Sequence, residues 1–96
     1  MSPLKKKQLS KIRFELDKLD NSLIKLIKKR TNLVKKVLEL KDKRNQIVDQ
    51  KRIKLILKNV KKKSIKNKID PKITNRIWKN MIWSYIDFEK RNFKKK

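Results

Sequence analysis

The stretch LSKIRFELDKLDNSLIKLIKKRTNLVKKVLELKDK, residues 9–43, carries the longest regular pattern of apolar residues in this sequence. Its apolar side chains recur every three or four residues, at Leu9, Ile12, Leu16, Leu19, Leu23, Leu26, Leu33, Val37 and Leu40. This spacing is typical of one face of an α-helix, and neither Gly nor Pro interrupts it. We therefore predict one helix of about 35 residues, roughly 50 Å long, that begins near Ser10 or slightly before it and continues through Lys43.

A helix of this length extends beyond the domain to which it belongs. The sequence has 96 residues, and a compact domain of that size is only about 33 Å across. A chain this small also buries a modest fraction of its surface when it folds alone. We therefore expect a single domain over residues 1–96, with basic ends that fray at Met1–Gln8 and Lys94–Lys96, whose long helix is covered by a second copy.

Two shorter helices are predicted after the long one. The polar residues Arg44–Gln46 are expected to end the first helix, and Asp49 is expected to cap the second. Asp70 followed by Pro71 predicts the start of a third helix that runs to about Asn92. The second helix carries an apolar face at Ile53, Ile56, Leu57 and Val60, and the third at Ile73, Ile77, Met81, Ile82, Tyr85, Ile86 and Phe93. The predicted class is therefore all-α with three helices.

The segment between the second and third helices has little to hold it in place. Residues 61–68 are mostly Lys, Ser and Asn, and only Ile65 and Ile69 are apolar enough to anchor this region. We therefore expect a loop or a frayed helix end there.

The composition excludes several classes of site. The sequence contains no Cys, no His and no Gly, which removes disulfides, the usual zinc ligands and the glycine-rich loops that bind nucleotide phosphates. Neither a zinc site of the usual kind nor a mononucleotide or dinucleotide fold is therefore expected. The start, MSPLKKKQLSK, lacks the apolar centre of a signal peptide, and no run approaches the ~20 residues of a membrane span. These features predict a cytoplasmic protein.

The formal net charge of +23, from 32 Lys and Arg against 9 Asp and Glu, has two explanations. One is compositional, because abundant Lys, Ile and Asn without Ala or Gly is the pattern that an AT-rich genome imposes on solvated helix faces. The other is an anionic partner of one of three kinds: nucleic acid, an acidic membrane surface or a small polyanion. The cations are spread along the whole chain and form no recognition-helix motif, so the compositional explanation is favoured.

Four polar residues interrupt the apolar patterns: Arg13, Arg30, Lys41 and Glu89. In a continuous helix, Lys41 follows Arg30 by about 16 Å and about 20° of rotation, so the two would face one cavity. Arg13 would lie about 25 Å before Arg30 on a different side, and an antiparallel copy of the helix would bring a second Arg13 to their level. The structural alternative is that each residue is only a register device or half of a buried ion pair.

Taken together, these residues resemble the all-α (AroQ-type) chorismate mutase family in its short bacterial form. The segment IRFELDKLDNSLIKLIKKR resembles the family's opening signature, VDQKR the start of its second helix, and IDPKITNRIWKNMI the entry to its third. The similarity covers about residues 9–93. It implies an intertwined homodimer in which each of two sites borrows an Arg from the other chain.

The resemblance also implies a role for each site residue. Arg30 and the partner's Arg13 would bind the two carboxylates of chorismate, while Lys41 and Glu89 would contact the ether oxygen of the bond that breaks. At the second and third helices the implied contacts to the substrate come from Asp49, Arg52 and Tyr85. The implied reaction is the rearrangement of chorismate to prephenate, in aromatic amino-acid biosynthesis, without a nucleophile, metal or cofactor.

Two positions depart from the family pattern. Ile53 replaces the Glu that binds the ring hydroxyl in many members, and Tyr85 stands where others have Ser, although Ser84 is adjacent. Both features are closer to the isochorismate-pyruvate lyase branch, which forms salicylate. Chorismate mutase is therefore the leading prediction, isochorismate-pyruvate lyase the second, and a basic helical nucleic-acid-binding protein an alternative from a different class.

Overall fold

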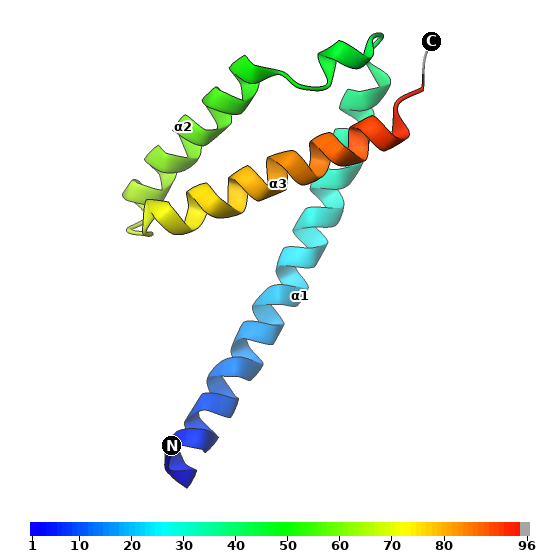
Figure 1. Cartoon of the computed structure of the whole chain (residues 1–96). Coiled ribbons are helices and arrows are strands. Elements are labelled where there is room, and N and C mark those ends of the chain that lie inside the picture. Colours follow the sequence, from blue (N-terminus) through cyan, green and yellow to red (C-terminus); the bar gives the residue numbers. More distant parts are fainter. Residues whose placement is uncertain (95–96) are drawn as a thin grey trace. The chain divides into compact units, whose positions relative to one another are not determined.

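The computed structural model describes residues 1–94, which form three α-helices and one short 3-10 turn without any strand (Figure 1). In chain order the elements are α1 (Pro3–Glu39), η1 (Arg44–Gln46), α2 (Gln50–Lys66) and α3 (Pro71–Asn92). The predicted all-α class with three helices is confirmed for this part of the chain. Residues 95 and 96 of the expected basic tail lie outside the described residues. The chain divides into two compact units, Met1–Leu33 and a second that begins at Val34.

The first unit consists of the N-terminal turns of α1, and its apolar stripe is uncovered. No residue of α1 is buried, and Leu16, Leu19 and Leu23 are each more than half exposed. Apolar surface of this extent on one helix face is typical of an association surface. The periodicity in the sequence therefore predicts the helix correctly, but within this unit the apolar face has no core to pack against.

Helix α1 begins seven residues earlier than Ser10, because residues near the start of the chain cap it. The Ser2 hydroxyl accepts the Lys5 amide at 3.2 Å, the Ser2 carbonyl accepts the Lys6 amide at 2.9 Å, and Pro3 occupies the first helical position. Proline suits this position because its missing N–H has no helical partner there. The expectation of a frayed basic lead over Met1–Gln8 is therefore wrong from Pro3 onward.

The same helix ends at Glu39, four residues before Lys43. Its last turn tightens, since the amides of Leu40 and Lys41 bond to carbonyls only three residues back, at 3.0 and 3.1 Å. The next two amides, of Asp42 and Lys43, donate to the side-chain oxygen of Gln46 at 2.8 and 2.9 Å. A side chain that accepts these amides competes with continued helix, which is why the predicted end was too late.

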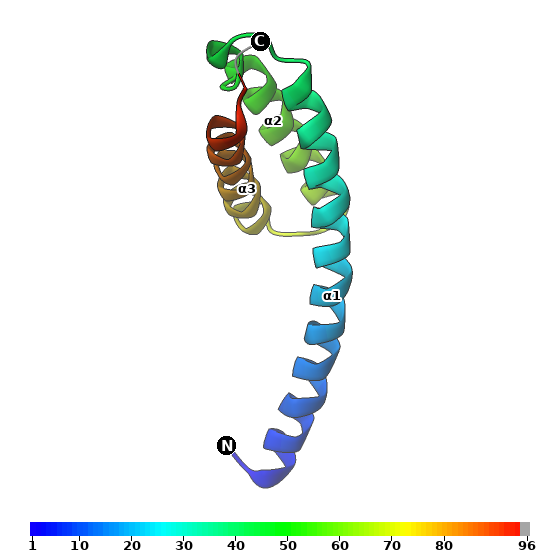
Figure 2. The ribbon, with the colours of Figure 1, turned by 90° about the vertical axis from the view of Figure 1, so that its right-hand side faces the viewer.

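The second unit is built on an antiparallel pair of helices. Helices α2 and α3 lie side by side and are joined by a short turn (Figures 1 and 2). Both predicted caps are confirmed, because Asp49 accepts the Arg52 amide at 3.0 Å and Asp70 accepts the Lys72 amide at 2.9 Å. The core of this unit consists of buried Ile47, Ile82 and Ile86, with Leu38, Val48, Ile53, Ile56, Leu57 and Phe93 packed around them. The predicted burial of Ile73 and Ile77 is wrong, since both are about half exposed.

Helix α2 continues to Lys66, through most of the segment that was expected to be a loop. The anchor is a buried hydroxyl pair, Ser64 and Thr74, whose oxygens lie 2.6 Å apart. Each hydroxyl also has a carbonyl acceptor on its own helix, Val60 at 2.6 Å for Ser64 and Pro71 at 3.3 Å for Thr74, so either can be the donor between the two. Ile65 and Ile69, the expected anchors, are 60% and 44% exposed. The spacing of apolar residues could not predict this contact, because it is made by two hydroxyl groups.

The end of α2 adopts a left-handed C-terminal cap at a lysine. Lys68 has a φ of 57°, and the Lys68 and Ile69 amides donate to the carbonyls of Ile65 and Ser64 at 3.1 and 2.9 Å. This is the Schellman arrangement, in which Gly is the usual residue at the left-handed position because it has no Cβ. Because Lys68 has a Cβ, its left-handed backbone conformation costs free energy that a glycine would not lose.

We expect Lys68→Gly to raise the free energy of unfolding by about 1 kcal/mol, because the left-handed backbone then costs less. The matched control is Lys62→Gly, which removes the same charge from an exposed position inside α2 and should lower stability by about 1 kcal/mol. Urea denaturation monitored by circular dichroism measures both changes. Equal destabilisation by the two substitutions would contradict the role assigned to the backbone of Lys68.

Candidate active site

An ion pair in the second unit connects residues far apart in the sequence. Lys41 Nζ donates to Glu89 Oε1 at 2.9 Å, and these side chains are only 17% and 8% exposed. Two of the four polar residues that interrupted the apolar patterns are therefore in direct contact. The same contact is what the structural alternative of a buried ion pair predicts, so contact alone does not assign a function.

Each member of the pair is held by its own element. Lys41 lies two residues beyond the end of α1, where its amide bonds to the Leu38 carbonyl at 3.1 Å. Glu89 lies on α3 three and seven residues after the buried Ile86 and Ile82, so it continues the face that packs into the core. The expectation that Lys41 shares a continuous helix with Arg30 is wrong, because α1 ends at Glu39.

Burial makes this pair electrostatically strong. A carboxylate and an ammonium that leave water lose hydration, and mutual attraction at short range in a low-dielectric environment offsets that loss. Removing one partner would leave an uncompensated charge, which typically costs about 3–5 kcal/mol. A cation held beside a carboxyl group in this way can contact an oxygen atom on which charge develops.

Asp49 and Arg52 lie at the first turn of α2, and both side chains are exposed. The Asp49 carboxylate accepts the Arg52 backbone amide at 3.0 Å, so Asp49 serves as the helix cap. This contact leaves the Arg52 guanidinium on the surface of the second unit.

Tyr85 and Ser84 differ in their relation to Glu89. Tyr85 is partly buried and precedes Glu89 by four residues, which places it about 40° away around the helix. Ser84 is exposed, lies about 140° away, and donates its hydroxyl to the Asn80 carbonyl at 2.7 Å. Tyr85 therefore shares the helix face of Glu89, whereas the Ser84 hydroxyl is engaged on its own helix.

The remaining two predicted site residues, Arg13 and Arg30, belong to the first unit. Both lie on α1, where Arg13 is exposed and Arg30 is partly buried. They are seventeen residues apart, which corresponds to about 25 Å along the helix. Arg13 therefore cannot bind the same small ligand as Arg30 from within one helix.

Arg44 was expected only as part of the turn that ends the first helix. Its Nη1 donates to the Lys90 carbonyl at 3.1 Å, and its guanidinium carbon lies 5.7 Å from the centre of the Phe93 ring. Both partners are within four residues of Glu89. No pattern in the sequence signals this contact, because Arg44 and Lys90 are separated by 46 positions.

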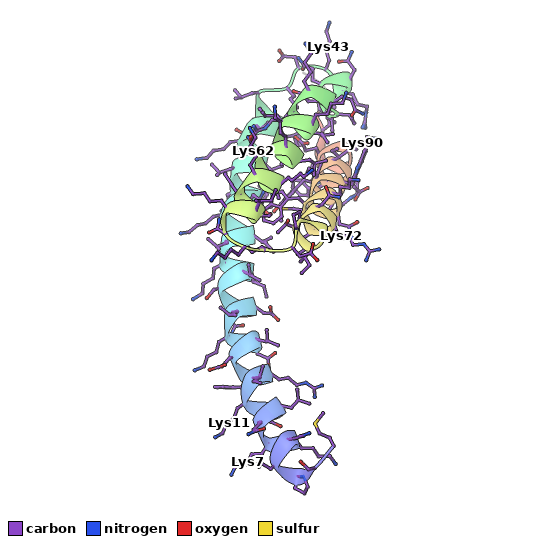
Figure 3. All side chains as sticks on the ribbon, turned by 90° about the vertical axis from the view of Figure 1, so that its left-hand side faces the viewer. Lys7, Lys11, Lys43, Lys62, Lys72 and Lys90 are labelled. Carbon is purple, nitrogen blue, oxygen red and sulfur yellow. The ribbon has the colours of Figure 1, made fainter. Side chains whose placement is uncertain are left out.

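The positive charge is distributed over all helices of the described part. Figure 3 labels lysines on α1 (Lys7 and Lys11), before η1 (Lys43), on α2 (Lys62) and on α3 (Lys72 and Lys90), and all six are exposed. The labelled lysines therefore do not gather on a single helix. Among the described residues, no helix combines the length and the hydropathy that a membrane-spanning segment requires.

The fold and the ion pair define a small all-α protein in which the segment after a long first helix meets the last helix through a buried cation and carboxylate. Residues 12–90 match the family model of chorismate mutase type II, so the chain belongs to that family. Membership makes it an isomerase that converts chorismate to prephenate. No curated protein and no solved structure matches the chain.

Proposed function

We propose that this protein accelerates the rearrangement of chorismate by restraining its conformation and by stabilising charge at the ether oxygen of the bond that breaks. The observation that carries the proposal is the contact of 2.9 Å between Lys41 and Glu89. Lys41 supplies a cation to this oxygen, and Glu89 donates a hydrogen bond to it when protonated. Preorganised donors of this kind stabilise a transition state without reorganisation at the moment of reaction.

Arg30 and the partner's Arg13 bind the two carboxylates in this proposal. Arginine suits the role because its planar guanidinium can donate two parallel hydrogen bonds to one carboxylate. Holding both carboxylates favours the chair-like conformer in which the reacting carbons approach each other. The rearrangement is intramolecular, so neither a nucleophile nor a redox cofactor enters the scheme.

Asp49, Arg52 and Tyr85 complete the proposed substrate-binding set. Asp49 and Arg52 lie together at the start of α2, where they would contact the ring hydroxyl and a carboxylate. Tyr85 lies one turn before Glu89 on the same face of α3, which supports Tyr85 rather than Ser84 as the residue that faces the substrate.

The proposed enzyme is an intertwined homodimer of this single domain. The uncovered apolar face of Met1–Leu33 supports this proposal, because a second copy of α1 would bury it. Sedimentation equilibrium at micromolar concentration should give twice the mass of one chain, which is 11.7 kDa. A well-folded monomer would contradict both the dimer and the shared site. We further propose that the dimer acts in the cytoplasm, in aromatic amino-acid biosynthesis.

Isochorismate-pyruvate lyase activity is the second candidate, and Ile53 favours it. Ile53 is partly buried and packs against the core of the second unit, so this position offers no ligand to a ring hydroxyl. Chorismate and isochorismate differ in the position of that hydroxyl. A site without the Glu ligand therefore has less basis for rejecting isochorismate.

The test is to incubate purified protein with chorismate and, separately, with isochorismate, and to identify the products. Prephenate from chorismate as the faster reaction would support the leading proposal. Salicylate and pyruvate from isochorismate as the faster reaction would favour the second candidate. Failure to convert either compound, with folding verified by circular dichroism, would contradict both.

A further inference from the structure

The segment from Lys41 to Ile47 is attached to α3 at three points. Lys41 contacts Glu89, Arg44 contacts the Lys90 carbonyl and the Phe93 ring, and Ile47 packs with Ile82 and Ile86 in the core. The central attachment belongs to a residue for which the scheme above has no role. A cavity of about 450 Å³ lined by Asp42, Lys43, Arg44 and Phe93 adjoins it.

Arg44 satisfies an unpaired group at the end of α3. The last four carbonyls of a helix have no partner within it, and the Lys90 carbonyl is one of these because α3 ends at Asn92. A cation at a helix C-terminus also interacts favourably with the partial negative charge there. The Phe93 ring beneath the guanidinium adds a cation–π contact.

These contacts determine where Lys41 can lie. The turn after Lys41 is closed by Gln46, whose side chain accepts the amides of Asp42 and Lys43. Arg44 lies inside this turn, so anchoring its guanidinium to α3 also anchors the backbone that carries Lys41. Without that anchor, the Lys41 pair and the packing of Ile47 are the two of these three attachments that remain.

We propose that Arg44 is a positioning residue that aligns Lys41 with Glu89 by joining the Lys41–Gln46 turn to the C-terminal end of α3. The expected effect of Arg44 on the reaction rate rests on the proposed function. The anchoring of the Lys41–Gln46 turn to α3 rests only on the contacts of Arg44. Displacement of a catalytic group by about 1 Å can lower a rate by about 100-fold. The alternative is that Arg44 only stabilises the fold.

The kinetic test is the Arg44→Ala protein. We expect kcat for chorismate to fall by about 10- to 100-fold while KM changes less than about threefold, because Lys41 acts on the transition state more than on binding. Arg44→Lys should recover part of kcat, since an ammonium can still approach the Lys90 carbonyl. The matched control is Arg91→Ala, which removes the same charge from the last turn of α3 but breaks only an exposed pair with Asp87. Its kcat should equal that of the wild type.

The structural test is amide hydrogen exchange of the Lys41–Gln46 turn. The amides of Asp42 and Lys43 should exchange about fivefold faster in Arg44→Ala, which is the change expected when one hydrogen bond that anchors the turn is lost. In Arg91→Ala their exchange rates should not change. Unchanged exchange in Arg44→Ala would overturn the inference, as would a lower melting temperature with an unchanged kcat. Faster exchange in a protein whose wild type does not convert chorismate would support the positioning role and overturn the proposed function instead.

Discussion

Proteins carrying Arg13→Ala or Arg30→Ala are each expected to lose activity by about 100- to 1,000-fold, yet a mixture of the two should recover activity. Removing a charged donor that acts on the transition state typically lowers the rate by this amount. In the proposed dimer, each site combines Arg30 of one chain with Arg13 of the other. A mixed dimer therefore contains one complete site and one that lacks both arginines.

Random pairing after joint unfolding and refolding makes half of the dimers mixed, so recovery should reach about a quarter of the wild-type rate. Lys29→Ala is the matched control, because it removes an exposed cation next to Arg30 and should change the rate less than about twofold. Steady-state assays on each protein and on the mixture measure the effect. If mixed dimers form but remain as inactive as either parent, Arg13 does not act across an interface.

Activity of the wild-type protein should fall as pH rises, and Glu89 should be responsible. Glu89 can donate a hydrogen bond to the ether oxygen only as the neutral acid, whereas the carboxylate repels the negative charge that develops there. The sign of this dependence follows from which protonation state donates.

Glu89→Gln should retain activity above neutral pH and flatten the profile, because the amide donates at every pH. The amide oxygen can also accept from Lys41, so this variant is expected to fold. Asp87→Asn is the matched control, since Asp87 lies two residues earlier on α3 in an exposed pair with Arg91 and should keep the wild-type profile. A wild-type rate that does not vary with pH, or an unchanged slope in Glu89→Gln, would make Glu89 only a structural partner of Lys41.

Local signals in the sequence were sufficient for the helices and for three of their boundaries, the starts of α2 and α3 and the end of α3. The three- and four-residue spacing predicted α1, and Asp49 and Asp70 with Pro71 predicted the starts of α2 and α3. These signals act between residues a few positions apart, so they can be read without a tertiary structure. The end of α1 was predicted less well, because the Gln46 side chain competes for amides that a helical pattern assigns to the helix.

The sequence by itself determined the all-α class, the starts of α2 and α3 and the polar residues that do not fit their apolar faces, among them Lys41 and Glu89. Only the tertiary structure decided that these two lie 2.9 Å apart, that Ser64 and Thr74 join α2 to α3, and that Arg44 caps the end of α3. Spacing along one helix identifies which face a residue occupies. It carries no information on which distant residue meets that face, since packing between helices brings together positions that are 10 to 48 residues apart.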